Sequence, residues 1–400
     1  MSEPIIEHRL LPTRTEIRNL LQARVVEAVE EVLREELTLM LGASRYERVE
    51  GRRGSRNGEK RRLVTTERGL VELNVPRGRV LERDGTTSEF GSAILPRYAR
   101  RTRKVDEAIL GAYLAGANTR RVRKALSPLL GEANLSKSAV SRVIARLKKL
   151  FARWAERDLS AESYPILFLD AINVKVRLAR RVVSVPVLVA LGVEEDGQKK
   201  VVDMRLAVSE SGVAWGGLIE DLGRRGLPEP TIVVSDGHAG LKKAMGLWDE
   251  ARVQRCTVHK LQNLYDHCPK HARAELKRDY DRIIYAKDGI AARKAYEEFM
   301  RKWSSFCPPV ARSLEEAGAH LLTFYEFPRG LWKAIRSTNS IENLNREFRR
   351  RTKTQASFST EDAALTLIYG LIAFGQINLR RIDGYKHLPK LARDARNEAA

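Results

Sequence analysis

The hydrophobic positions within residues 14–41 recur at the spacing of an α-helix, and the pattern ends at Gly42. An amphipathic helix buries one side and commonly stops at a glycine, so the spacing predicts a single helix over this range. The apolar residues that define this side are Ile17, Leu20, Leu21, Val25, Val29, Val32 and Leu33.

Residues 46–62 differ because they contain the run GRRGSRNGEKRR and show no apolar period. Such a stretch is either a solvated linker or a flexible basic arm that lies on phosphates, and the sequence leaves both interpretations open. Residues 63–80 then alternate well enough to predict a β-hairpin with its turn at Gly69. A second basic cluster follows within residues 97–104.

From residue 105 the pattern is helical, and residues 118–130 and 137–150 are two candidate helices with Gly131 between them. Ser136 is placed to cap the second helix, so we predict a helix-turn-helix. The second helix is expected to bury Val140, Val143, Ile144 and Leu147. Its outer surface, which suits base edges and phosphates in a major groove, consists of Lys137, Ser138, Ser141, Arg142 and Arg146.

Near residue 160 the pattern changes to strand-like runs at residues 165–178, 181–193 and 199–208. A helix-like segment at residues 212–226, an apolar run that ends at Asp236 and a short strand within residues 252–257 follow. This order of elements predicts a mixed sheet with helices on its faces. Residues 258–326 are almost wholly helical in pattern, and we expect their large apolar residues to form core.

The composition narrows the choice of partner more than the choice of fold. The 400 residues carry 72 Lys and Arg against 51 Asp and Glu, a net charge of +21. An excess of this size points to a polyanion, most simply nucleic acid. Three cysteines are too few for a disulfide scaffold, and every apolar run falls short of the roughly 20 residues of a membrane helix. We expect a soluble, cytoplasmic, nucleoid-associated protein that does not engage a membrane.

Two aspartates stand at equivalent points, Asp170 after the apolar run ILFL and Asp236 after IVVS. If the two strands are neighbours, both carboxylates emerge together at a cleft beside the sheet. Carboxylates that close repel each other unless a cation lies between them, and hard oxygen ligands suit Mg²⁺ or Mn²⁺. The alternative is that they are turn residues or helix caps, which applies above all to Asp236 because Gly237 follows it.

A third acid, Glu342, lies in STNSIENLNREFRRRTK, where residues 337–339 can cap a helix. Arg346 and Arg349 follow at i+4 and i+7 and share its face. One interpretation is an intrahelical Glu–Arg pair on a solvated surface. The other makes Glu342 a metal ligand beside arginines that hold phosphates. Three such acids can hold two metal ions, one activating the attacking oxygen and one stabilising the leaving oxygen.

Together these segments resemble the bacterial insertion-sequence transposases of the Mutator type. The matching segments run in family order from about residue 50 to 375, and they are SRNGEKRRLVTTERGLVELNVPRGR, LSKSAVSRV, FLDAINVKVR, SDGHAGLKKA, QRCTVHKLQNL and FPRGLWKAIRSTNSIENLNREFRRRTK. The resemblance implies a ribonuclease-H-like catalytic fold, a DDE triad of Asp170, Asp236 and Glu342, and two Mg²⁺ or Mn²⁺ ions. It also implies a copy-out route and a homodimer or larger assembly on paired DNA ends.

The family motif also includes Cys256 and His259, a C-x2-H pair that we expect to brace the Asp236 region by packing and hydrogen bonding. With His267, Cys268 and His271 the pair could be drawn as a zinc site. We do not expect zinc, because the first pair straddles a strand–helix junction and no second pair has the spacing of a zinc finger.

The expected architecture is a mixed α/β fold in six parts. These are an N-terminal helix (1–45), a mostly helical DNA-binding region with the basic arm, β element and helix-turn-helix (46–158), a ribonuclease-H-like core in two pieces (159–245 and 331–378), an all-α insertion between them (246–330) and a basic tail (379–400). We expect the large tryptophans Trp215, Trp303 and Trp332 to be core, although stacking on an unpaired base is the alternative.

The expected function is that of a DNA transposase, which binds the terminal inverted repeats of its element and target DNA and catalyses metal-dependent strand cleavage and strand transfer. Two alternatives stay open: a metal-dependent nuclease of the same fold, and a non-enzymatic DNA-binding regulator. The residues expected to contact DNA are Arg52, Arg53, Arg56, Arg100, Arg101, Arg103, Lys137, Ser138, Ser141, Arg142, Arg146, Arg346, Arg349 and Arg350.

Overall fold

The chain divides into two compact units, seen here in a computed structural model. The first unit consists of Met1–Tyr113 and Ala117–Ile144, and the second of Leu114–Gly116 and Ala145–Ala400. The structure describes residues 13–67, 69–130, 135–237, 241, 244 and 248–389. The expected basic tail therefore lies outside the described residues from residue 390 on. Within the described part, no helix combines the length and the apolar character needed to cross a membrane.

Helix α1 (Arg14–Leu41) forms over the predicted range, but most of the predicted apolar side is exposed, at Ile17, Leu20, Leu21, Val25 and Val32. Thr13 caps its start: the hydroxyl accepts the Glu16 N–H at 3.3 Å, and the Glu16 carboxylate accepts the Thr13 N–H at 2.7 Å. Gly42 ends the helix with a φ of 63°, in the left-handed region that favours glycine. The side chains of its C-terminal half that are fully buried are Leu33, Leu37 and Leu41.

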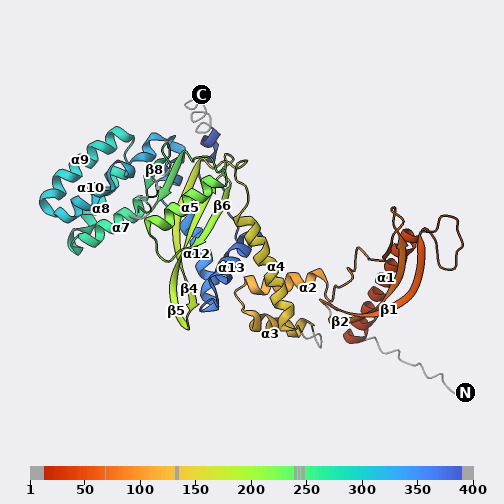
Figure 1. Cartoon of the computed structure of the whole chain (residues 1–400). Helices are drawn as coiled ribbons and strands as arrows, with labels where there is room; N and C mark the ends of the chain where they lie inside the picture. The colour runs from red at the N-terminus through yellow and green to blue at the C-terminus, as the bar shows by residue number, and fades with distance from the viewer. Residues whose placement is uncertain are drawn as a thin grey trace, which may run out of the picture. The chain divides into compact units, whose positions relative to one another are not determined.

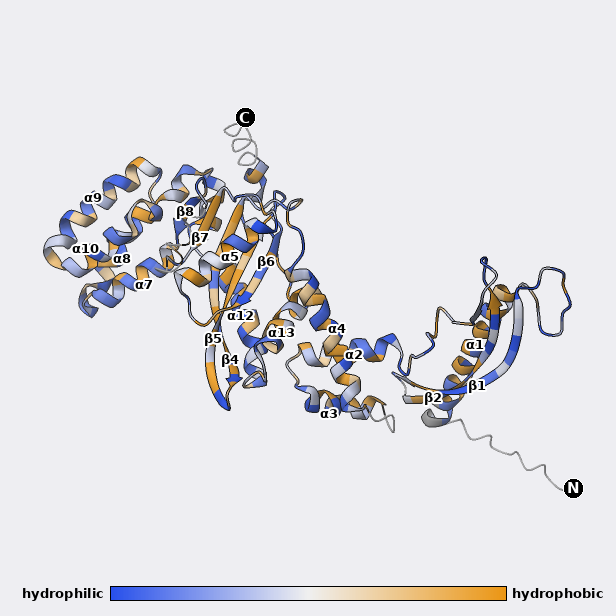
Figure 2. Cartoon of the chain, viewed as in Figure 1, coloured by the Kyte–Doolittle hydropathy of each residue, from blue (hydrophilic) through white to orange (hydrophobic). Residues whose placement is uncertain are grey.

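The supposed linker or arm is one half of a long β-hairpin from residue 54 on, which corrects the expectation for residues 46–62. Strand β1 (Gly54–Thr66) pairs antiparallel with β2 (Gly69–Leu81), and β3 (Thr87–Glu89) continues the sheet beside β2. β1 shows no apolar period because most of its side chains are exposed, and Figure 2 shows that it is mostly hydrophilic. Backbone hydrogen bonds to β2 therefore define the strand. The β2 side chains that pack with α1 and Val64 are Val71, Leu73 and Val75.

Three helices follow: α2 (Arg103–Leu114), α3 (Thr119–Leu130) and α4 (Lys137–Ala155). The Ser136 hydroxyl accepts the Ala139 N–H at 3.1 Å, which is the cap that the sequence predicts. The expected inner side of α4 is buried at Val140, Val143 and Leu147. Its expected outer residues are exposed, and these are Lys137, Ser138, Ser141, Arg142 and Arg146. The turn expected around Gly131 lies outside the described residues.

The second unit is built on a mixed sheet with the strand order β6-β5-β4-β7-β8 (Figure 1). The predicted meander is confirmed, since β4 (Ile166–Leu178), β5 (Arg181–Val193) and β6 (Lys199–Leu206) pair antiparallel in sequence. Strand β7 (Ile232–Ser235) then pairs parallel with β4, and β8 (Arg252–Arg255) pairs parallel with β7. The last strand lies inside residues 246–330, so that stretch is not all-α, and its helical part begins only after β8.

Helices cover both faces of this sheet. Helix α5 (Gly212–Arg224) packs its Trp215 and Leu218 against one face, in a cluster that includes Leu169 of β4. Because successive strand side chains point to opposite faces, the next residue, Asp170, lies on the other face. There it meets helix α12 (Asn339–Thr352), which is followed by α13 (Glu361–Ala373). The sheet thus presents Asp170 to α12.

The other helices whose bounds the structure describes lie between β8 and α12, as the pattern predicts. They are α7 (Thr257–His267), α8 (Arg273–Ile284), α9 (Gly289–Phe306), α10 (Pro308–Ala317) and α11 (Trp332–Ile335), with short 3-10 turns at Lys270–Ala272, Gly318–Leu321, Thr323–Glu326 and Arg329–Leu331. Two more such turns follow α12 and α13, at Lys353–Gln355 and Tyr385–His387. The predicted core stripe is buried at Tyr280, Ile283, Ile284, Phe299 and Trp303.

A buried ion-pair network ties the edge strand β6 to the end of α5. Arg225 and Asp203 are both 2% exposed at their side chains, and Nη2 of Arg225 lies 3.1 Å from Oδ2 of Asp203. The Arg225 Nε donates to Asp221 at 2.8 Å. Charges this deep need partners, because an unpaired one would lose its hydration without compensation.

Candidate active site

Asp170 and Asp236 occupy neighbouring positions on adjacent parallel strands. The pairing of β4 with β7 ends at Leu169 and Ser235, and the two aspartates are the next residue on each strand. Asp170 does not end a strand, as the apolar run suggested, because β4 continues to Leu178 in pairing with β5. What ends at this point is the parallel pairing, and the edge left open there holds both carboxylates.

The environment of Asp170 disfavours its negative charge. Burial, together with the nearby charge of Asp236, raises the pKa of Asp170 to about 6, although hydrogen bonds from the Ala171 N–H and from Asn345 act in the opposite direction. The amide Nδ2 of Asn345 donates to Oδ2 of Asp170 at 2.7 Å. Asp170 therefore neither caps a helix nor closes a turn. The backbone does turn after Asp236, since Gly237 has a φ of 81°.

Glu342 lies in the first turn of α12 and is held by Thr338, the residue at its N-cap. The Thr338 hydroxyl donates to Oε1 of Glu342 at 2.6 Å instead of capping the helix. Oε1 of Glu342 also lies 3.8 Å from Nδ1 of His259. Glu342 is therefore held toward α7, and the intrahelical pair with Arg346 that the spacing allows is not the contact it makes among the described residues.

Cys256 and His259 tie the start of α7 to the segment before α12. Cys256 is fully buried, and its Sγ accepts the Thr338 N–H at 3.4 Å. The Thr257 N–H donates to the carbonyl of Arg336 at 2.9 Å. These bonds join two segments that are about 80 residues apart in the sequence.

His259 is electrostatically linked to all three acids. Its hydrogen bond with Cys256 raises the pKa of His259 to about 9, and the charges of Glu342 and Asp236 raise it as well. The same imidazole lowers the pKa of Asp170. Burial alone would raise the pKa of the Cys256 thiol, but its bonds with His259 and Thr338 bring it below its ordinary value. A protonated His259 thus offsets part of the negative charge that the three carboxylates bring together.

The donor atoms of this locality fit a divalent cation. Asp170, Asp236 and Glu342 each interact electrostatically with His259, and Oδ1 of the fully buried Asn345 has no hydrogen-bond partner among the described residues. Carboxylate and amide oxygens are ligands that Mg²⁺ and Mn²⁺ accept. A second set of ligand atoms, one each from Cys256, His259 and Glu342, lies within 4.8 Å of one another. Its sulfur and nitrogen atoms are softer ligands, of the kind that zinc binds.

The larger zinc pattern that the sequence allowed is not assembled as one site. His267 ends α7, and Cys268 and His271 follow it, whereas His259 lies in the first turn of the same helix. His267 lies eight positions after His259 on the helix, which is about 12 Å along the axis. The two halves of the C-x2-H-x7-H-C-x2-H pattern therefore lie apart.

Two residues of the site, Thr338 and Asn345, are missed by our reading of the sequence. Both are fully buried, and each bonds to one of the acids. They stand at i−4 and i+3 from Glu342, so helical spacing could have placed them on its face. The helical spacing indicates these two residues as well as the arginines Arg346 and Arg349.

Several residues expected to contact DNA are engaged within the protein. Arg56 donates to the Thr38 hydroxyl at 2.7 Å and to the carbonyl of Ala43, which ties β1 to α1. Arg52 donates to the carbonyl of Gly54, and Arg101 and Arg103 pair with Asp106 and Glu107. Arg350 pairs with Glu347 at 2.9 Å. Four of the expected DNA-contacting residues outside α4 are exposed and form no ion pair with a carboxylate in the described part of the chain, namely Arg53, Arg100, Arg346 and Arg349.

The expected tryptophans are core rather than stacking surfaces. Trp215 and Trp303 are at most 1% exposed. Trp332 is half-buried, and its indole N–H donates to the carbonyl of Phe327 at 2.7 Å. None of these three rings offers a free face on which an unpaired base could stack.

Comparison with known proteins connects this arrangement to one family. The family model described as Transposase, Mutator family, matches residues 6–378. The chain is 36% identical over 370 residues to the transposase for insertion sequence element ISRM5 of Rhizobium meliloti, covering 91% of this chain and 89% of that protein. It is 35% identical over 348 residues to the transposase for IS406 of Burkholderia multivorans, covering 86% and 87%. The transposase for IS256 in transposon Tn4001 of Staphylococcus aureus is 32% identical over 345 residues, covering 84% and 85%. The chain therefore belongs to the Mutator family of transposases.

Proposed function

We propose that this transposase cuts and joins DNA strands at a triad formed by Asp170, Asp236 and Glu342. The observation that carries the assignment is their convergence: β4, the end of β7 and the first turn of α12 each supply one acid, and His259 interacts with all three. The strand order, with three antiparallel strands followed by two parallel ones, supports a ribonuclease-H-like fold for the second unit.

The chain's own groups are suited to hold a divalent cation between the carboxylates. Asn345 orients Asp170, Thr338 orients Glu342, and His259 balances part of the charge. When bound, Mg²⁺ or Mn²⁺, as two ions, would neutralise charge on the attacking and leaving oxygens of a phosphodiester. We assign to the site two in-line displacements at phosphorus. In the first, water displaces a 3′-oxygen at the element end, and in the second that 3′-hydroxyl displaces the 3′-oxygen of another strand.

DNA recognition is assigned to the first unit and to α4. We propose that α3 and α4 form the helix-turn-helix, and that exposed Lys137, Ser141 and Arg142 read terminal inverted repeats of double-stranded DNA. Residues 46–158 then form the DNA-binding region, with 159–245 and 331–378 as the catalytic core. The helical insertion between them begins at Thr257, after β8. Pairing of two element ends calls for a homodimer or larger assembly.

The test replaces each acid by its amide: Asp170→Asn, Asp236→Asn and Glu342→Gln. Each change removes a cation ligand worth several kcal/mol of transition-state stabilisation, so cleavage of a duplex that carries an element end should slow by about 10³-fold or more. Glu347→Gln, on the same helix but paired with Arg350, is the matched control and should cut normally. Normal cleavage by the Glu342→Gln protein would rule out the triad.

Two further assays separate the alternatives. A duplex with a pre-cut 3′-hydroxyl should give joined product with the transposase, and a plain nuclease would give none. DNA binding by all three amide variants should stay normal, because the acids do not hold the DNA. A regulator would instead give the same result with and without a divalent cation in every assay.

A further inference from the structure

The first unit contains a groove of about 620 Å³ beside the hairpin. Its walls come from β1, β2 and the residues that follow β3, and Val75, Phe90 and Leu95 are among its apolar lining. Register brings the walls together, since Lys60 of β1 stands opposite Val75 of β2, and Arg62 stands opposite Leu73. The basic side chains that line it are Lys60, Arg62, Arg77, Arg97, Arg100 and Arg142.

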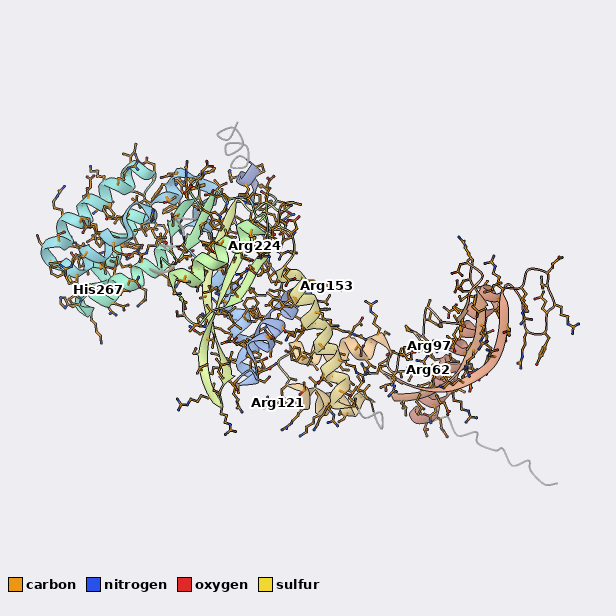
Figure 3. The ribbon with its side chains drawn as sticks, in the orientation of Figure 1. Arg62, Arg97, Arg121, Arg153, Arg224 and His267 are labelled. Atoms are coloured by element: carbon orange, nitrogen blue, oxygen red, sulfur yellow. The ribbon has the colours of Figure 1, made fainter. Side chains whose placement is uncertain are left out.

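The groove is strongly basic. Glu89 is the single carboxylate among its lining residues, and it pairs with Arg97. Arg62, which is labelled in Figure 3, donates to the carbonyls of Pro96 and Ala99. These two bonds fix the segment after β3 against the hairpin. Lys60, Arg77 and Arg100 are exposed, and none of the ion pairs within the described part of the chain involves them.

The basic residues next to the groove differ from Lys60, Arg77 and Arg100 in having acidic partners. Arg101, Arg103 and Lys104 each have an acidic partner, Asp106, Glu107 and Glu67 in turn. The groove instead leaves a surplus of cations facing one hollow, where a polyanion can replace the counterions that screen their mutual repulsion. Tyr98 also lines the groove, and its ring, which is 84% exposed, adds a flat surface at the rim.

We propose that this groove binds the sugar-phosphate backbone of double-stranded DNA without regard to sequence. This proposal rests on DNA as the substrate proposed above. The groove adds a second DNA contact to the one made by α4. Arg142 belongs to both, because it lies on the outer surface of α4 and lines the groove. Phosphate contacts position a duplex, and base contacts specify it, so the groove holds the duplex whose bases α4 reads.

The test removes three groove cations in the full-length protein, as Lys60→Gln, Arg77→Gln and Arg100→Gln together. The control removes three exposed cations of the same hairpin that do not line the groove, as Arg61→Gln, Arg79→Gln and Arg83→Gln. Both proteins carry the same net charge. Binding of a labelled duplex of arbitrary sequence is then measured against salt concentration, and the unfolding midpoints confirm that both proteins are folded.

Each lost phosphate contact lowers the salt slope by about 0.9, so the groove variant should lose about 2.7 from the slope of log affinity against log salt. The drop in affinity between 50 and 200 mM salt then becomes about 40-fold smaller than in the parent protein. The control should keep the parent slope. Equal changes in both variants, or no change in the groove variant, would overturn the assignment.

A second measurement does not depend on variants. Lys60 in the parent protein should lose its reactivity toward an amine-labelling reagent when the duplex is bound, and full reactivity of Lys60 in the complex would contradict the groove. A duplex RNA that competes equally would also overturn the choice of DNA. Failure of the triad is separable, because inactive amide variants and the parent should show the same salt slope.

Discussion

Asn345 of α12 donates its amide N–H to Oδ2 of Asp170 in β4 at 2.7 Å, across 175 residues of sequence. This bond joins the helix that carries Glu342 to the strand that carries the first acid. Because both partners are at least partly buried, the bond favours the ionised form of Asp170. The orientation of Asp170 is therefore coupled to the position of the helix that carries Glu342.

Replacing Asn345 by Ala should shift the pH dependence of cleavage. Without this donor the pKa of Asp170 rises above about 6, so its carboxylate is ionised only at higher pH. We expect the acid limb of the rate profile, measured at limiting Mg²⁺, to move up by about one pH unit. Asn343→Ala, at an exposed position of the same helix, serves as control. An unmoved acid limb would show that the bond does not tune Asp170.

Asp170→Asn should stabilise the metal-free protein at neutral pH while abolishing cleavage. The folded-state pKa of about 6 lies above the ordinary value of 3.8, so the contribution of Asp170 to stability is present below pH 4 and is lost as the pH rises through 6. The difference of 2.2 units corresponds to at most about 3 kcal/mol. Unfolding midpoints should therefore be higher for the variant at pH 7 and similar at pH 4. A difference that does not change with pH would refute this account.

Thr338→Val should weaken cation binding without removing a ligand. Valine keeps the shape of the buried side chain but loses the hydroxyl that donates to Glu342 at 2.6 Å. The cation concentration needed for half-maximal cleavage should rise by about 10–100-fold, as for other residues that orient ligands. Thr338→Ser restores the donor and should recover most of the loss. If serine and valine behave alike, the residue acts through packing.

Breaking the buried ion pair of the sheet should destabilise the second unit strongly. Asp203→Ala leaves Arg225 buried without this partner, which typically costs about 3–5 kcal/mol. Lys200→Ala, which breaks an exposed pair with Glu194, should cost less than about 1 kcal/mol. Denaturant unfolding of both variants gives the comparison. Similar losses for the two would mean that the network contributes no more than a surface pair.

Removing divalent cations should separate chemistry from binding. Chelation should abolish strand cleavage and joining, since the carboxylates then lack the charge that they share. Binding of duplex DNA should persist, because the contacts proposed for the first unit are between basic side chains and phosphates and need no metal ion. Gel-shift and cleavage assays on the same samples measure both. Loss of binding on chelation would place a cation at the DNA interface instead.

Long elements with a clear period were predictable, and β1 shows where prediction failed. Strands β4, β5 and β6 are apolar enough to be read directly, and their bounds agree with the predicted runs to within two residues. β1 consists largely of arginines, glycines and polar residues, yet it is a strand because β2 offers a complete row of backbone partners. Local composition cannot report a partner strand whose paired residues lie as far as 26 positions away, as Gly54 and Val80 do.

The amino-acid sequence by itself determined the order of the elements, the three acids and the excess of positive charge. Only the tertiary structure decided what those residues contact. It gave Glu342 to Thr338 and His259 rather than to Arg346, and it tied Asn345 to Asp170. It also paired much of the basic cluster with acids, while Lys60, Arg77 and Arg100 of the groove have no ion pair among the described residues. The physical reason is that period and propensity act over a few residues, whereas hydrogen bonds, desolvation and charge pairing depend on which distant segments the packed core brings together.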